Sequence, residues 1–311
     1  MKKSKTEELN ELFEEWIENQ KDKIEKGKKL HKFFAKDGII CEEEYRKSGT
    51  RILFILKEPN IMKDLIDENY DDDQRIFYND FFNNKFYDEI NIEDGNRELK
   101  AIRNDTLIKR GILEVKENEN EKNYYYPFDN IPVKQKEKIA RMAEYIINRK
   151  ITDNYDDLKN ALKQAAFMNL NKSGGYADSD KNYFLSYCEK FSSNICKEIE
   201  IIDPQIIVLI GTKSYKNGDK YLLNKKINSL FNEKKVIEVV HTAARGKALN
   251  IHEDEKEILK RKFNTKYNDN LDEMYNNIVQ TDKSKLHMKY DRGVFKFFLK
   301  FVAAYEKNEK N

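Results

Sequence analysis

The chain has 311 residues, which is enough for one large domain with an insertion or for two domains. Although 37% of the residues are charged, 39% are hydrophobic and 12% are aromatic, so wholesale disorder is excluded. The 58 basic residues nearly cancel the 56 acidic residues, and the net charge of +2 neither favours nor excludes a nucleic-acid partner.

The cysteines and the N-terminus indicate the cellular compartment. Cys41, Cys188 and Cys196 form no CxxC pair and no zinc-ligand spacing, which fits a reduced cytoplasm and excludes a metal site built on cysteine. The first residues are charged from the outset, and no apolar run approaches the roughly 20 residues of a membrane span. We therefore expect a soluble, cytoplasmic protein that is a monomer and has no membrane partner.

The N-terminal part of the chain carries two different patterns. Apolar residues in 5–36, beginning with Leu9, Leu12 and Trp16, follow helical spacing and predict an amphipathic helix or helix pair. We assign residues 1–48 to an N-terminal helical extension. The contiguous apolar run 52–56 instead predicts a strand that is buried on both faces of a sheet.

The segment 61–135 is predicted to be an insertion or lid that is partly helical. It contains an acidic run at 71–73, an aromatic cluster over 77–87 and a polar stretch before three tyrosines at 124–126. The aromatic cluster is expected to form the core of this insertion.

Strands and helices alternate through the rest of the chain. Further strands are predicted at 165–170, 206–210 and 236–241, and helices near 135–149, 155–165, 180–200, 219–232 and 253–280. A terminal docking helix is expected at 294–305, within a C-terminal segment 281–311. The alternation predicts one α/β domain over 1–311, a three-layer α/β/α fold with a short four-stranded parallel sheet.

Ligands of such sheets bind beyond the carboxyl ends of the strands, near the topological switch point. The four predicted strand ends carry residues 57–60, Asn169, 211–213 and 241–242. A carboxylate, an amide and an imidazole at one sheet edge suit cleavage of an N-glycosidic bond. The carboxylate stabilises a cationic sugar or activates water, the amide reads the edge of a flipped base, and the imidazole stabilises the leaving base.

The motifs LKEPN, FMNLN, IIVLIGT and VVHTAARG, in this order, resemble the layout of the uracil-DNA glycosylase superfamily. In that superfamily a GQDPYH or GEAPG motif follows the first strand, a later strand ends in Asn, and the last strand ends in a His. The resemblance covers roughly residues 50–60 and 160–250. It implies that Glu58 is the water-activating acid, Pro59 the motif proline, Asn169 the base reader and His241 the leaving-group histidine.

The chain departs from the superfamily's pattern in five ways. The acid is Glu58 instead of Asp, and Asn60 replaces the tyrosine that bars the methyl group of thymine in the GQDPYH family. The loop after His241 lacks the apolar wedge, for which Arg245 or Leu249 is a substitute, and the iron–sulfur cysteines of some families are absent. The insertion between the first two motifs is also longer than in compact members.

The remaining candidate residues border the same edge. Lys57, Pro59 and Asn60 are predicted to contact the base together with Asn169. The resemblance also implies that one aromatic residue of 77–87 stacks on the flipped base, as a phenylalanine does in the relatives. A predicted DNA-binding rim comprises Lys172, Ser173, Lys213, Thr242, Arg245 and Lys247. Simpler interpretations remain open: Glu58 caps a turn, Asn169 bonds loop backbone, and the lysines form a solvated rim.

The sequence therefore supports a DNA glycosylase that releases a uracil or modified base without metal or cofactor, in DNA repair or defence against phages. The alternative is a glycosylase-fold protein that binds nucleic acid without cleaving it. An unrelated nucleotide-binding α/β hydrolase is disfavoured because no GxGxxG or GxxxxGK[ST] loop follows a strand.

Overall fold

The structure is a computed structural model. It describes residues 3–20, 34–57, 131–173, 181–211, 220–241, 246–264, 270–279 and 291–309, and the short strands at 24–25, 28–29, 71–73, 114–118, 121–125 and 216–217.

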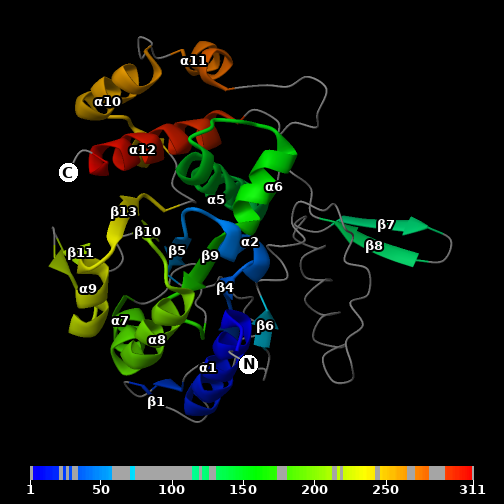
Figure 1. The fold of residues 1–311 in the computed structure, drawn as a ribbon, viewed down its shortest axis with the longest axis vertical. Helices are drawn as coiled ribbons and strands as arrows, with labels where there is room; N and C mark the ends of the chain where they lie inside the picture. Colours follow the sequence, from blue (N-terminus) through cyan, green and yellow to red (C-terminus); the bar gives the residue numbers. More distant parts are fainter. Residues whose placement is uncertain are drawn as a thin grey trace.

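A five-stranded, mostly parallel sheet lies at the centre of the molecule (Figure 1). Four strands run parallel, and the edge strand β4 is antiparallel to β9. In spatial order the strands are β13 (Lys235–Val239), β10 (Ile206–Ile210), β5 (Ile52–Leu56), β9 (Ala165–Asn169) and β4 (Gly38–Ile39). The four parallel strands lie where the sequence predicts them. The expectation of a four-stranded sheet is wrong, because the N-terminal part of the chain adds β4.

The strand order determines where a ligand site is expected. From β5 the chain passes to β9 on one side and later to β10 on the other side of β5. The topological switch point therefore lies between β5 and β10, and crevices form there at the carboxyl ends of parallel strands.

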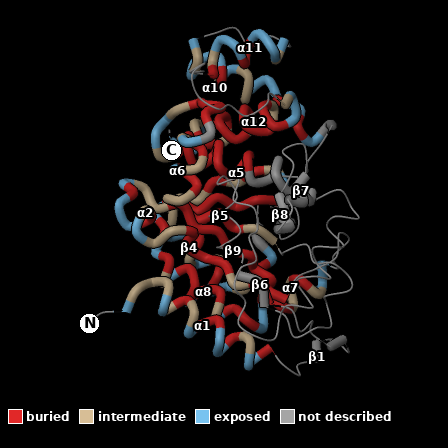
Figure 2. The backbone as a smooth tube through the Cα atoms, turned by 90° about the vertical axis from the view of Figure 1, so that its right-hand side faces the viewer, coloured by how far each residue is buried: buried red, intermediate tan, exposed pale blue. Residues whose placement is uncertain are grey.

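Alternate residues of the strands enter two separate hydrophobic clusters, so helices cover both faces of the sheet (Figures 1 and 2). Phe54 and Val208 belong to one cluster, whereas Leu53 and Leu209 belong to the other. The first face carries α5 (Ile131–Asn148), α6 (Tyr155–Lys163), α10 (Glu253–Phe263), α11 (Leu271–Ile278) and α12 (Arg292–Asn308). The second carries α1 (Lys5–Gln20), α7 (Lys181–Lys190), α8 (Ser192–Ile202) and α9 (Lys225–Asn232). Burial on both faces explains the contiguous apolar runs of the strands.

Side chains that accept backbone hydrogen bonds define where several helices begin. Asn154 accepts from the backbone of Asp156 at 2.9 Å at the start of α6. Asp291 accepts from Val294 N at 2.9 Å at the start of α12. Such N-caps satisfy amides that have no partner within the helix.

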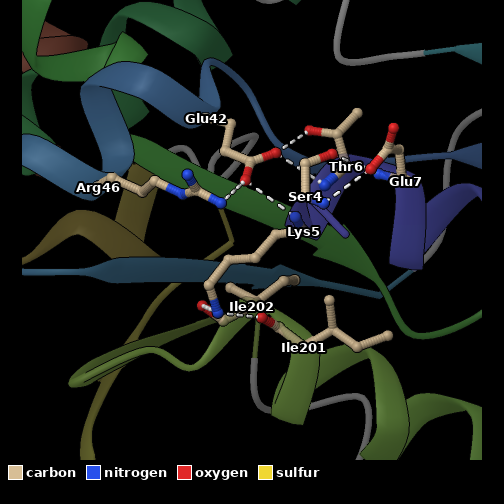
Figure 3. Close-up of polar contacts among 8 residues, drawn as sticks. All are labelled: Ser4, Lys5, Thr6, Glu7, Glu42, Arg46, Ile201 and Ile202. Carbon is tan, nitrogen blue, oxygen red and sulfur yellow. Dashed lines mark hydrogen bonds and ion pairs between the residues drawn. The ribbon is translucent and has the colours of Figure 1, made fainter. Parts of the chain in front are cut away.

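The N-terminal segment is part of the core instead of a helical extension. Among its described residues, α1 and the short α2 (Glu42–Lys47) are helical, but residues 34–36 (β3, Phe34–Lys36) and 38–39 are strands, and 38–39 joins the central sheet as β4. Glu42 of α2 accepts hydrogen bonds from the backbone amides of Lys5 and Thr6, each at 2.9 Å (Figure 3). The ammonium of Lys5 in turn donates to the carbonyl of Ile201 at the end of α8 (Figure 3). These contacts join three elements that are far apart in the sequence.

Other element boundaries differ from the predictions in smaller ways. The helix predicted at 180–200 is two helices that meet at Phe191, and the helical region 253–280 is α10 and α11. The strand predicted at 236–241 ends at Val239, so His241 lies two residues beyond it. The helix α12 confirms the predicted terminal docking helix.

Little of the predicted insertion 61–135 is described. Its described parts are β6 (Asp71–Asp73), which pairs in parallel with β3, and the start of α5. It also includes an antiparallel hairpin formed by β7 (Glu114–Asn118) and β8 (Glu121–Tyr125). The aromatic cluster 77–87 lies outside the described residues, so its place beside a base stays a prediction.

Candidate functional site

The carboxyl ends of the parallel strands are aligned by their register. Leu56 of β5 pairs with Asn169 of β9. The ladder continues past the strand end, since Asn171 N donates to Lys57 O at 2.9 Å. On the other side of the switch point, Gly211 N donates to Val239 O at 3.0 Å. The residues that follow β5, β9, β10 and β13 therefore leave the sheet at one edge.

His241 packs closely against Gly211 at this edge. A Cβ atom added to Gly211 would lie 2.9 Å from Cδ2 of His241, and Gly211 has a φ of +76°. Any other residue at position 211 would meet both the imidazole and a left-handed backbone conformation. Gly211, the first residue after β10, therefore allows close approach of His241, which follows β13.

The electrostatic surroundings of His241 are positive. Partial burial of the imidazole lowers its pKa below the ordinary value, and the charges of Lys138 and Lys57 lower that pKa further. Residue 241 as a whole is nevertheless exposed to solvent. His241 is consequently neutral at neutral pH, with one ring nitrogen that donates and one that accepts.

The two lysines beside His241 come from opposite layers of the molecule. Lys57 follows β5 and lies 5.3 Å from the ring centroid of Phe184 on α7. Lys138 belongs to α5 and lies 4.9 Å from the ring centroid of Phe297 on α12. A neutral donor near two cations favours an anion, such as a departing base or a phosphate.

Lys138 is a site residue that the sequence does not reveal. It occurs in a lysine-rich amphipathic helix, where nothing distinguishes it from its neighbours. Only the packing of α5 over the sheet brings it near His241, about one hundred positions later in the chain.

Asn169 does not have the surroundings expected of a base reader. It is 3% exposed, and both its backbone N and its Nδ2 donate to Oδ2 of Asp37, at 2.6 and 3.0 Å. The amide nitrogen is thus directed at the side chain of Asp37, which immediately precedes the edge strand β4. This contact also differs from the simpler interpretation, in which Asn169 bonds loop backbone, because its partner is a side chain 132 residues away.

Two residues of the predicted DNA-binding rim lie in the interior, and that part of the prediction is wrong. Lys172 is fully buried and ion-paired with Asp37 and Glu198. Ser173 is also fully buried, and its hydroxyl lies 2.7 Å from Oδ1 of Asn171 and 3.1 Å from the hydroxyl of Tyr183.

The proposed substitute wedge is also partly corrected. Leu249 ends a 3₁₀ helix, η3 (Gly246–Leu249), and packs into the hydrophobic cluster of the first face with 5% exposure. A side chain buried in the core is not available to displace a base.

The remaining predicted site residues lie outside the described residues: Glu58, Pro59, Asn60, Lys213, Thr242 and Arg245. Lys247 lies in η3, but its side chain is not described. The convergence of Glu58, Asn169 and His241 on one cleft therefore stays a prediction. The described residues bring together Lys57, the neighbour of Glu58, and His241.

Neither a metal site nor a membrane span is evident in the described part of the chain. No three histidine, cysteine, aspartate or glutamate residues there are grouped so that they could hold a metal ion. Within the same residues, no helix is both long and apolar enough to cross a bilayer.

Comparisons of the chain with known protein families, with curated proteins and with solved structures found no match in any of the three.

Proposed function

We propose that the chain is a DNA glycosylase that hydrolyses the N-glycosidic bond of a uracil or modified base flipped out of DNA. The observation that supports this most is His241 at the carboxyl end of the sheet, packed against Gly211 and close enough to Lys57 and Lys138 for their charges to lower its pKa. A base that leaves with the bonding electron pair is an anion, which this arrangement suits.

The reaction breaks the bond between C1′ of the sugar and the base nitrogen. The electron pair leaves with the base, and the oxygen of a water molecule adds to C1′. An N–H group of His241 donates a hydrogen bond to the developing anion. Glu58, whose role comes from the resemblance in motif order, faces the cationic sugar and activates the water. Lys57 and Lys138 add a positive potential that favours both the leaving base and the DNA phosphates.

The direct test uses single- and double-stranded oligonucleotides that carry uracil or a modified base, followed by alkali to cleave abasic sites. We expect strand cleavage with at least one base, and loss of that cleavage in Glu58→Gln with DNA binding retained. The matched control is Glu43→Gln on α2, an exposed glutamate in an ion pair with Lys47, which should leave cleavage unchanged. Base release that survives Glu58→Gln would show that the carboxylate was wrongly chosen.

The engagement of Asn169 with Asp37 favours a second candidate, a glycosylase-fold protein that binds nucleic acid without cleaving it. A protein without a free amide at this position has lost the predicted reader of the base edge. Such a protein would show salt-dependent DNA binding, because phosphate contacts release counterions. It would release no base from any of the oligonucleotides, whether wild type or variant.

A further inference from the structure

Three fully buried charged side chains meet under the second face of the sheet. Asp37 lies between β3 and β4, Lys172 follows β9, and Glu198 belongs to α8, and all three are 0% exposed at the side chain. The Lys172 ammonium donates to Oδ1 of Asp37 and, at 2.8 Å, to Oε1 of Glu198. Asp37 and Lys172 are 135 residues apart in the sequence.

The charges of this triad do not balance if every group is ionised. Two carboxylates and one ammonium sum to −1, and an uncompensated charge in the interior is strongly unfavourable. Two carboxyl groups that share one site avoid this by keeping one proton between them. The triad with one proton is neutral.

The hydrogen bonds indicate which carboxyl group keeps the proton. Asp37 accepts three hydrogen bonds, one from the Lys172 ammonium and two from N and Nδ2 of Asn169. Glu198 accepts from Lys172 at Oε1, and its Oε2 also lies 2.8 Å from the Lys172 ammonium, although no donor among the described residues is aligned for a hydrogen bond to Oε2. Burial raises the pKa of Glu198 well above its ordinary value, and the adjacent Asp37 raises it further against the opposing charge of Lys172.

The described aromatic groups around the Lys172 ammonium are neutral. The rings of Phe13 and Trp16 on α1 lie 5.4 and 5.6 Å from the Lys172 ammonium. Tyr187 of α7 stacks on Trp16 and donates to Gln20 at 2.9 Å, and burial raises the pKa of this tyrosine, so it stays protonated. The charged groups that act on Glu198 are therefore Lys172 and Asp37.

The triad joins segments that border the candidate site. Asp37 holds the backbone of Asn169 at the end of β9, and the carbonyl of Lys172 accepts from Ala35 N at 2.9 Å. Between these residues, Asn171 N donates to the carbonyl of Lys57. These hydrogen bonds therefore connect the triad to the strand end beside Lys57.

We propose that Asp37, Lys172 and Glu198 form a proton-dependent latch, which holds the carboxyl end of β9 beside Lys57 while Glu198 is protonated and releases it when that proton is lost. The proposal does not depend on the glycosylase reaction. Its consequence is a site whose geometry is stable at neutral and acidic pH and loosens in alkali.

The decisive comparison is the pH dependence of unfolding in the wild type and in Glu198→Gln. A carboxyl group whose pKa is raised by folding stabilises the protein fully below the unfolded pKa of about 4.3, and this stabilisation is lost as pH rises through the folded pKa. The neutral amide has no such dependence. We expect the folding equilibrium constant of Glu198→Gln, relative to the wild type, to rise about tenfold for each pH unit above about 4.3 until the folded pKa is reached.

Two further measurements separate the latch from a simple packing effect. The carboxyl carbon resonance of Glu198 in ¹³C-glutamate-labelled protein should remain at the protonated position at pH 7. Hydrogen-exchange protection of the Asn169 amide should decrease in alkali in the wild type and persist in Glu198→Gln. Glu200→Gln, an exposed position on the same helix, is the matched control and should behave as the wild type.

Either of two results would overturn the proposal. One is a stability difference between Glu198→Gln and the wild type that does not vary with pH. The other is an ionised Glu198 resonance at neutral pH, which can be observed in the wild type and does not require any variant to fold.

Discussion

Lys57 and Lys172 follow neighbouring parallel strands, yet they have opposite surroundings. Lys57 comes directly after β5, is partly exposed and acts on His241. Lys172 comes three residues after β9 and is fully buried between two carboxyl groups. The comparison shows that the position of a lysine at a strand end does not determine whether it can meet a ligand. The elements that cover that end decide it.

The physical difference lies in the partners that each ammonium finds. Burying an ammonium costs several kcal/mol unless opposite charges and hydrogen bonds compensate it. Asp37 and Glu198 supply that compensation from the N-terminal segment and α8, so Lys172 is tolerated in the interior. Lys57 instead extends along the Phe184 ring and keeps its charge near the sheet edge.

The largest expected effect is the difference in lost stability between a Lys172 variant and a Lys57 variant. Lys172→Met leaves Asp37 buried without its cation and should lower the free energy of unfolding by about 3–5 kcal/mol. Lys57→Met removes a partly exposed charge and should change it by about 0.5 kcal/mol or less. Urea unfolding of both variants measures the difference, and similar losses would contradict the distinction.

The next largest effect is on the rate of base release at the site that Lys57 borders. If the protein is a glycosylase, His241→Ala should slow base release by roughly 10²–10⁴-fold, the scale for one positioned donor or electrostatic contact. Single-turnover assays measure the rate, and urea unfolding should show little change because residue 241 is solvent accessible. Unchanged base release in this variant would remove His241 from the mechanism.

A smaller effect tests whether the N-terminal segment that supplies Asp37 belongs to the core. Glu42→Ala removes the carboxylate that caps α1 at Lys5 and Thr6, and should cost about 1 kcal/mol, as the loss of an N-cap does. Glu43→Ala, the exposed neighbour in α2, serves as the control. Thermal unfolding distinguishes the two, and equal midpoints would argue against a structural role for this contact.

The smallest effect is a change in the titration of His241. Lys138→Met removes one of the positive charges that lower the imidazole pKa, so that pKa should rise toward its ordinary value. Lys57→Met should act in the same direction, whereas Lys172→Met should not. Proton NMR of the histidine resonances as a function of pH gives the three values, and a decrease in the pKa would contradict the positive surroundings inferred here.

Histidine titration also bears on the pH dependence of stability. The folded pKa of His241 is lower than the unfolded value, so the unfolded chain binds a proton first as pH decreases. The associated stability is fully present above the unfolded pKa of about 6.5 and is lost as pH falls toward the folded pKa. His241→Ala should therefore reduce the loss of stability between pH 7 and mildly acidic conditions, a trend opposite to that of Glu198→Gln.

The sequence alone determined the parallel strands and most helices of this protein. The runs 52–56 and 206–210 are apolar at every position because both faces of each strand are buried, and this pattern needs no knowledge of partners. The positions of His241 and Lys57 at the carboxyl edge follow from the same pattern.

Only the tertiary structure decided which polar residues at that edge face solvent. The strand β4 is two residues long, too short to produce a periodic signal, yet it brings Asp37 beside Asn169 and Lys172. Lys138 likewise reaches His241 only through the packing of α5. Burial and pairing of a charge depend on residues more than one hundred positions away, and local sequence patterns carry no record of such contacts.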